Sequence, residues 1–93
     1  MDRNEESILA IAEILRDSAA MNDAALAGDF DEARFRAKLI VGKADAAGHS
    51  DLVRAGAHLM YTLGPMGTPP HSGYGAGMLR IANELDRIGF TPL

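Results

Sequence analysis

The feature that most constrains this chain is the spacing of its apolar residues, which recur every three or four positions in four successive segments. That period is typical of amphipathic helices, and no stretch shows the strict alternation of a strand. Alanine is abundant and β-branched residues are few, which also favours helices. The segments predict helices over about 5–26, from Asp29 to the turn at Gly48, over about 51–63, and from about Ser72 to Gly89.

Capping residues and helix breakers mark the ends of these helices. Asn4 and Ser50 are good N-caps, and Asp29 with Glu32 three residues later forms an aspartate version of the capping box. The breakers are Gly28, Gly48 and the pair Gly64-Pro65, and residues 64–73 form one long irregular connection. Four helices in this order predict an all-α, antiparallel four-helix bundle that forms a single domain over residues 1–93.

Each helix is expected to turn its apolar stripe toward a shared core. The first helix is either continuous or broken near Met21, and its stripe consists of Ile8, Ile11, Leu15, Ala19, Asn22 and Leu26. The stripe of the third helix consists of Leu52, Ala55, Gly56, Leu59 and Leu63. That of the fourth consists of Met78, Ile81, Ala82, Leu85 and Ile88.

Composition excludes several classes of protein. The chain has no cysteine, which excludes disulfides, thiolate nucleophiles and cysteine metal sites. Its formal net charge of −4 argues against binding to nucleic acid or anionic lipid, both of which need basic patches. No apolar run approaches the roughly 20 residues of a membrane-spanning helix. We therefore expect a cytoplasmic protein that does not interact with a membrane.

The three histidines suggest no metal site. His49, His58 and His71 are separated by nine and thirteen residues, and these spacings fit no common pattern of metal ligands. We expect exposed or half-exposed histidines instead.

The glycines at 73, 75 and 77 do not form a nucleotide-binding motif. The preceding strand of a dinucleotide site and the lysine of a P-loop are both absent. We expect these glycines to let another backbone, or the loop at Pro69-Pro70, pack closely. Since no serine or threonine has a base near it in sequence, we predict no enzyme activity and no cofactor.

The second helix is unusual because it carries two apolar stripes on roughly opposite sides. One consists of Phe30, Ala33, Ala37, Ile40, Val41 and Ala44, and the other of Phe35, Leu39, Gly42 and Ala46. A peripheral bundle helix needs only one stripe. The second stripe must therefore be buried against something else. The candidates are another part of the same chain (the first helix or the proline-rich loop), a second subunit, or a target protein. We predict a protein partner, with a symmetric homodimer as the simplest complex, bound through Phe35, Arg36, Lys38, Leu39, Gly42 and Lys43.

The charge distribution predicts how the first two helices pair. Residues 1–28 contain six acidic and two basic side chains, so this segment carries the whole net charge of −4. The bases are concentrated in the second helix. We predict that the two helices lie antiparallel and that Arg34, Arg36 or Lys38 contacts the acidic side of the first. Exposed pairs contribute only about 0–1 kcal/mol each, so they direct the pairing more than they stabilise it.

Several short motifs follow one another within residues 24–59. An Ala27-Gly28-Asp29 turn leads into the second helix, Ala37-Lys38-Leu39-Ile40-Val41-Gly42 lies in its middle, and small residues and a glycine turn follow at 44–48. This order resembles the histidine-containing phosphotransfer (Hpt) domain of two-component signal transduction, in which the helix carries an Ala-His-x-Leu-Lys-Gly core. The fold of that family, an antiparallel four-helix bundle, agrees with the prediction from the helix pattern.

The decisive position departs from the Hpt pattern. Lys38 stands where the family has its phosphorylated histidine, and Val41 replaces the neighbouring lysine. A protonated lysine has no lone pair with which to attack an aspartyl phosphate. The resemblance therefore implies a pseudo-phosphotransfer module that binds a receiver domain without accepting phosphate.

Two alternatives remain beside this regulatory or adaptor module. In a second register, Ala57-His58-Leu59 takes the place of the core motif, and His58 would be the phosphoacceptor of an active phosphocarrier. The other alternative is a purely structural, homo-oligomeric helical protein.

Overall fold

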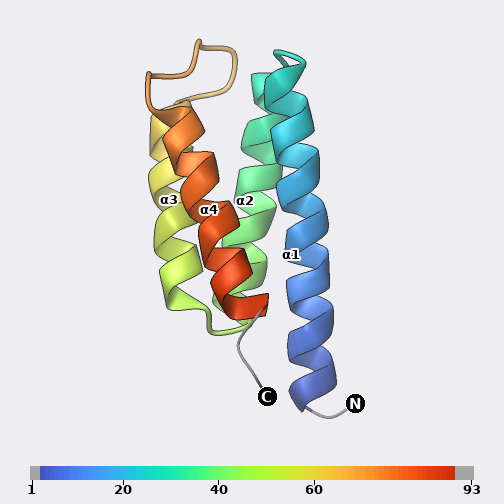
Figure 1. Cartoon of the computed structure of the whole chain (residues 1–93). Helices are drawn as coiled ribbons and strands as arrows, with labels where there is room; N and C mark the ends of the chain where they lie inside the picture. The colour runs from blue at the N-terminus through green and yellow to red at the C-terminus, as the bar shows by residue number, and fades with distance from the viewer. Residues whose placement is uncertain (1–2, 90–93) are drawn as a thin grey trace.

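The computed structural model describes residues 3–89, which form four helices joined by two short turns and one long loop. The helices are α1 (Arg3–Leu26), α2 (Phe30–Ala46), α3 (Ser50–Leu63) and α4 (Tyr74–Gly89). Consecutive helices run in opposite directions (Figure 1). No strand occurs among the described residues. The predicted all-α four-helix bundle is confirmed.

The helix ends follow the predicted breakers closely. Gly28, Gly48 and Gly64 all have a positive φ between +75° and +79°, which glycine adopts without the steric penalty of other residues. The Asp29 carboxylate accepts a hydrogen bond from the Glu32 backbone N–H at 3.2 Å, which confirms the predicted N-cap of α2.

Two other predicted caps are wrong. Ser50 is the first residue of α3, and the N-cap is His49, whose side chain makes no capping hydrogen bond. The first helix begins at Arg3, so Asn4 lies inside α1, and the helix continues through Met21 without a break.

The core lies where α2 packs against α1 and α3, and α3 against α4. Its fully buried large side chains are Ile14, Met21, Ile40, Leu52, Leu59, Leu63 and Ile81. A Cβ added at Gly56 would lie 2.6 Å from Val41 Cγ2, and one at Gly77 would lie 3.1 Å from Leu59 Cδ1. Gly77 thus allows close packing of α4 on α3, whereas nothing lies within 4 Å of the corresponding position at Gly73 or Gly75.

The predicted core stripe of the first helix is wrong. Ile8 is 56% exposed, Leu15 is 46% exposed and Leu26 is 88% exposed. The buried face of α1 consists instead of Ile14, Asp17, Ser18, Met21 and Ala24. Helical spacing alone could not choose between these faces, because Ile14, Met21 and Ala24 also recur at helical intervals and Asp17 would ordinarily be placed in solvent.

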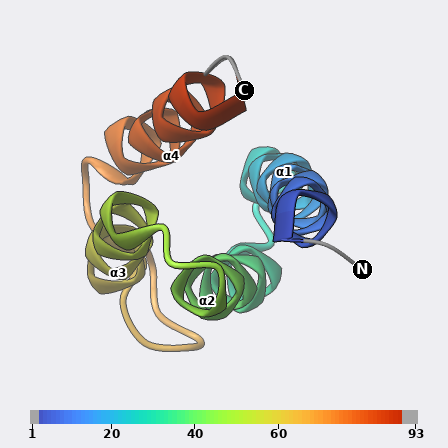
Figure 2. The ribbon, with the colours of Figure 1, turned by 90° about the horizontal axis from the view of Figure 1, so that it is seen from below.

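The four helices form an arc when the bundle is viewed end-on, with α1 and α4 at its two ends (Figure 2). Packing between α1 and α4 is much sparser than between any two consecutive helices. The bundle is therefore least closed along the side where α1 faces α4. Within residues 3–89, no helix is both long and apolar enough to cross a membrane.

Candidate functional site

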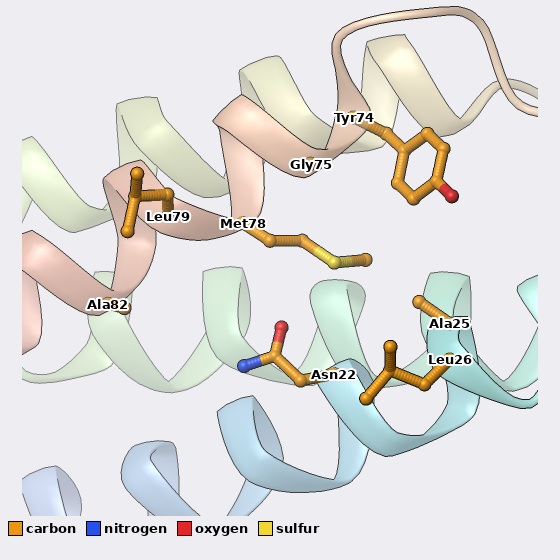
Figure 3. Close-up of a pocket in the computed structure, with 8 residues that line it drawn as sticks. All are labelled: Asn22, Ala25, Leu26, Tyr74, Gly75, Met78, Leu79 and Ala82. Atoms are coloured by element: carbon orange, nitrogen blue, oxygen red, sulfur yellow. The ribbon is translucent and has the colours of Figure 1, made fainter.

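An apolar groove lies between α1 and α4, where the bundle is least closed (Figure 3). It encloses about 460 Å³. The residues that line it are Asn22, Ala25 and Leu26 of α1 and Tyr74, Gly75, Met78, Leu79 and Ala82 of α4. The Met78 side chain extends into the space between the two helices, and the Asn22 amide points toward it. We call this apolar feature the α1/α4 groove.

Small residues and one aromatic pair shape this groove. Ala25, Gly75 and Ala82 have little or no side chain, which leaves room between the helices. At one end the Tyr74 ring packs edge-on against Phe30 of α2, with ring centroids 5.3 Å apart and an interplanar angle of 80°. This contact connects the start of α4 to the start of α2 and fixes that end of the groove.

Apolar side chains continue from the groove along α1. Helical spacing places Ile8, Ile11 and Leu15 on the same side of α1 as Asn22 and Leu26. Across the groove, Leu79 of α4 is 61% exposed. Two of the residues assigned to the core from the sequence, Asn22 and Leu26, thus line one wall of an open groove.

Ion pairs between α1 and α2 set the orientation of α1. The Asp17 side chain is only 5% exposed, and its two oxygens lie 3.0 Å from Arg36 Nη1 and 2.7 Å from Lys43 Nζ. Hydrogen bonds from Arg36 to Glu32 and then to Asp17 raise the pKa of the Arg36 guanidinium. The predicted antiparallel pairing is confirmed for Arg36, and Lys43 contributes as well. Because Asp17 faces α2, the stripe of Ile8, Leu15 and Leu26 must face elsewhere.

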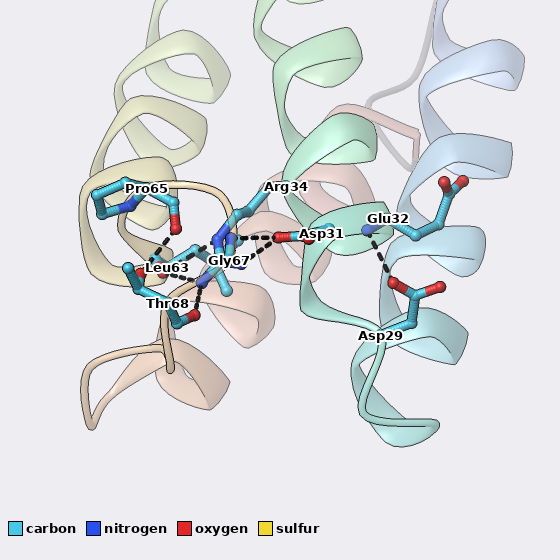
Figure 4. A network of polar contacts seen from close by, with 8 residues as sticks. All are labelled: Asp29, Asp31, Glu32, Arg34, Leu63, Pro65, Gly67 and Thr68. Atoms are coloured by element: carbon cyan, nitrogen blue, oxygen red, sulfur yellow. Dashed lines mark hydrogen bonds and ion pairs between the residues drawn. The ribbon is translucent and has the colours of Figure 1, made fainter.

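Arg34 does not contact α1 and instead joins α2 to α3 and the 64–73 loop (Figure 4). Its Nε and Nη2 donate to the Leu63 carbonyl oxygen at 3.2 and 2.7 Å, and Nη2 also donates to the Thr68 carbonyl oxygen. The last carbonyls of a helix have no partner within the helix, so the buried Arg34 guanidinium caps the C-terminal end of α3.

Asp31 completes this network. Its Oδ1 accepts from Arg34 Nη1 at 2.6 Å and from the Gly67 backbone N–H at 2.9 Å. The Gly67 hydrogen bond, followed by the one from Arg34, lowers the pKa of the Asp31 carboxyl below its ordinary value. The role of this pair has no signal in the local sequence, because the loop residues that it binds are more than 30 positions away.

The predicted partner-binding surface of α2 is only partly available. Phe35 is 49% exposed, Lys38 and Gly42 are exposed, and Leu39 is half-buried. Arg36 and Lys43 are engaged in ion pairs with α1, and the Arg36 guanidinium lies 5.9 Å from the centroid of the Phe35 ring. The partner-binding role of these residues stays a prediction.

The histidines lie apart from one another. His58 is exposed on α3, where its backbone carbonyl accepts from Thr62 Oγ1 at 3.0 Å. His71 is exposed in the loop. His49 is half-buried, and its Nε2 has no hydrogen-bond partner. The described residues include no cluster of three or more metal-ligating side chains, and phosphorylation of His58 stays a prediction.

No family model, curated protein or solved structure matches this chain.

Proposed function

We propose that the protein is a small protein-binding module, of a regulatory or adaptor kind, which accepts a helix of a partner protein in the α1/α4 groove. The observation that carries this proposal is the exposure of Leu26 and Leu79 on opposite walls of an apolar groove between two helices that pack sparsely. Contiguous exposed apolar surface in a globular domain commonly marks an interaction site.

The lining of the groove favours a helical occupant over an extended one. An extended segment needs partners for its backbone N–H and C=O groups, whereas a helix satisfies these groups internally. Among the lining residues, only Asn22 and Tyr74 have polar side chains. A helix along the groove would contact α1 and α4 together and would cover Leu26 and Leu79. The flexible Met78 side chain can adapt to different apolar side chains.

Titration with a synthetic amphipathic helix tests this proposal. The probe is a fluorescently labelled peptide with leucines on one face and uncharged glutamines on the other, and its fluorescence anisotropy reports binding. We expect saturable binding by the native protein. The Leu26→Glu variant should lose about tenfold or more in affinity, because burying a leucine side chain contributes about 1.5–3 kcal/mol.

The control variant is Leu9→Glu, which places the same charge on the same helix. Leu9 is exposed but lies about a third of a turn or more away from the stripe that contains Ile8 and Leu15. We expect it to bind the peptide as the native protein does. Absence of binding by folded native protein, or equal losses in both variants, would contradict the proposed function.

The hypotheses based on the Hpt resemblance concern other surfaces. Docking of a receiver domain would use the α2 surface around Phe35 and Lys38, and phosphate transfer would use His58 on α3. None of these residues lines the α1/α4 groove. Incubation with a radiolabelled small phosphodonor distinguishes the receiver-binding module from the active phosphocarrier. Only an active phosphocarrier would incorporate label, and the substitution His58→Gln would abolish that labelling.

A further inference from the structure

The charged residues beside the α1/α4 groove are mostly acidic. Asp86 follows the lining residue Ala82 by one helical turn, so it lies on the groove side of α4. Asp23 precedes the lining residue Leu26 by about one helical turn on α1, and helical spacing places Glu5 and Arg16 along the same edge. All four of these residues are exposed. Carboxylates thus outnumber the single guanidinium by three to one.

Most of the basic residues of the chain are already engaged on other sides of the bundle. Arg36 and Lys43 pair with Asp17, Arg34 is buried against α3, and Arg54 and Arg87 both contact Asp51. Arg80 lies on the outer face of α4, about 100° around the helix from Leu79. Among residues 3–89, no cation lies within ion-pair distance of Asp23 or Asp86.

We infer that the helix that binds in the α1/α4 groove is a basic amphipathic helix, with leucine-like side chains on one face and lysines or arginines beside them. The inference rests on the proposed function and specifies the partner. The apolar face fills the space around Met78, while the long basic side chains reach Asp86 on one wall and Asp23 on the other. Attraction between opposite charges across an interface selects partners and fixes their orientation.

The same charges disfavour a second copy of this chain in the groove. Its α1 would bring the same apolar stripe, but also Glu5 and Asp23 with only Arg16 to offset them, toward the wall that contains Asp86. Juxtaposed like charges oppose association. We therefore do not expect self-association through this face. The experiment must distinguish it from binding of a partner helix.

Three peptides with the same leucine face test the inference. Their polar faces consist of lysine, glutamate or glutamine, and fluorescence anisotropy measures their affinities for the full chain near physiological salt. We expect the lysine peptide to bind at least tenfold more tightly than the glutamate peptide, with the glutamine peptide between them. The substitutions Asp86→Asn and Asp23→Asn should each reduce the ratio between lysine and glutamate peptides, with little change for the glutamine peptide.

Non-specific attraction between a basic peptide and an acidic protein is excluded by two charge-matched variants. Both Leu26→Glu and Leu9→Glu add one negative charge to α1, so non-specific attraction would strengthen binding of the lysine peptide in both. Binding in the groove predicts weaker binding of the lysine peptide by Leu26→Glu, whereas Leu9→Glu, which adds a carboxylate to the edge that contains Glu5 and Asp23, should bind it at least as tightly as the native protein. Strengthened binding in both variants would overturn the inference.

The remaining outcomes separate the inference from the proposed function. Equal affinities for all three peptides would contradict the inference that the partner helix is basic. They would not contradict the proposed function, which is the binding of a helix in the α1/α4 groove. No peptide binding by a monomeric, helical protein would overturn both. No peptide binding by a native dimer that becomes a monomer in the Leu26→Glu variant would show that a second copy occupies the groove, which would also overturn the inference. Light scattering measures the oligomeric state, and circular dichroism checks that each variant is folded.

Discussion

Arg34 of α2 holds the backbone carbonyl oxygen of Leu63, the last residue of α3, with two N–H groups at 3.2 and 2.7 Å. The two residues are 29 positions apart in the chain. The same guanidinium also binds the Thr68 carbonyl in the loop that leads into α4. One buried side chain therefore fixes where α3 ends and where the path to α4 begins.

The substitution Arg34→Met should destabilise the fold. Methionine keeps an apolar stem of similar length, but it removes every donor and leaves the Leu63 and Thr68 carbonyls without this partner. Hydrogen bonds that involve a charged group contribute about 1.5–3 kcal/mol, so we expect a loss of about 2–4 kcal/mol in the free energy of unfolding. Urea denaturation followed by circular dichroism measures it. Arg54→Met, at an exposed arginine, serves as a control and should change stability by less than about 0.5 kcal/mol.

The lowered pKa of Asp31 makes part of the stability depend on pH. The folded pKa lies below the ordinary value of 3.8. The stabilisation by this carboxylate is therefore fully present above the unfolded pKa, and it is lost as the pH falls through the folded pKa. In urea titrations between neutral pH and about pH 2, we expect Asp31→Asn to remove part of the acid-induced loss of stability. An unchanged acid dependence in this variant would show that the Gly67 and Arg34 contacts do not stabilise the charged form.

The buried Asp17 carboxylate should matter more than an ordinary surface charge. Asp17→Asn would leave Arg36 and Lys43 without their shared anion on the face that attaches α1 to α2. Both cations are about one third exposed, so solvent reduces the cost, and we expect a loss of about 1–3 kcal/mol in unfolding free energy. The matched control is Asp23→Asn, at an exposed position of the same helix. Equal effects of the two substitutions in thermal or urea denaturation would refute this role of Asp17.

The substitution Phe35→Arg tests whether Phe35 lies on the solvent-exposed face of α2 or on the face that packs in the core. Since Phe35 is 49% exposed, an arginine there can extend into solvent, and we expect the variant to keep its helical circular dichroism. If the native protein is a dimer through the α2 surface, light scattering should show that this variant is monomeric. Phe30→Arg is the comparison on the core side, and it should lose about 2–4 kcal/mol because it disrupts the packing against Tyr74 and the core. A loss of helical signal in Phe35→Arg would instead place Phe35 in the core.

Local signals were enough to predict the fold, because the breaks between the helices are encoded within a few residues. The glycines at 28, 48 and 64 and the Asp29 cap illustrate this. The groove was missed for a different reason. The apolar stripe of α1 was recognised, but its burial depended on which neighbour α1 contacts, and the contacts of Asp17 with two cations of α2 decided this. The position of Arg34 likewise depended on loop residues far away in the chain.

The close approach of Gly56 to Val41 has a consequence for how the protein adjusts to a ligand. Val41 Cγ2 occupies the space next to Gly56 where any other residue would carry its Cβ. Rotating α3, or sliding it along α2, would bring the side chain of a neighbouring α3 residue into that space, so the contact opposes such movements of this pair of helices. Neither α2 nor α3 lines the α1/α4 groove. Packing between contacting helices is sparsest for α1 and α4, so we expect changes in the width of the groove on binding to come from movements of these two helices relative to each other.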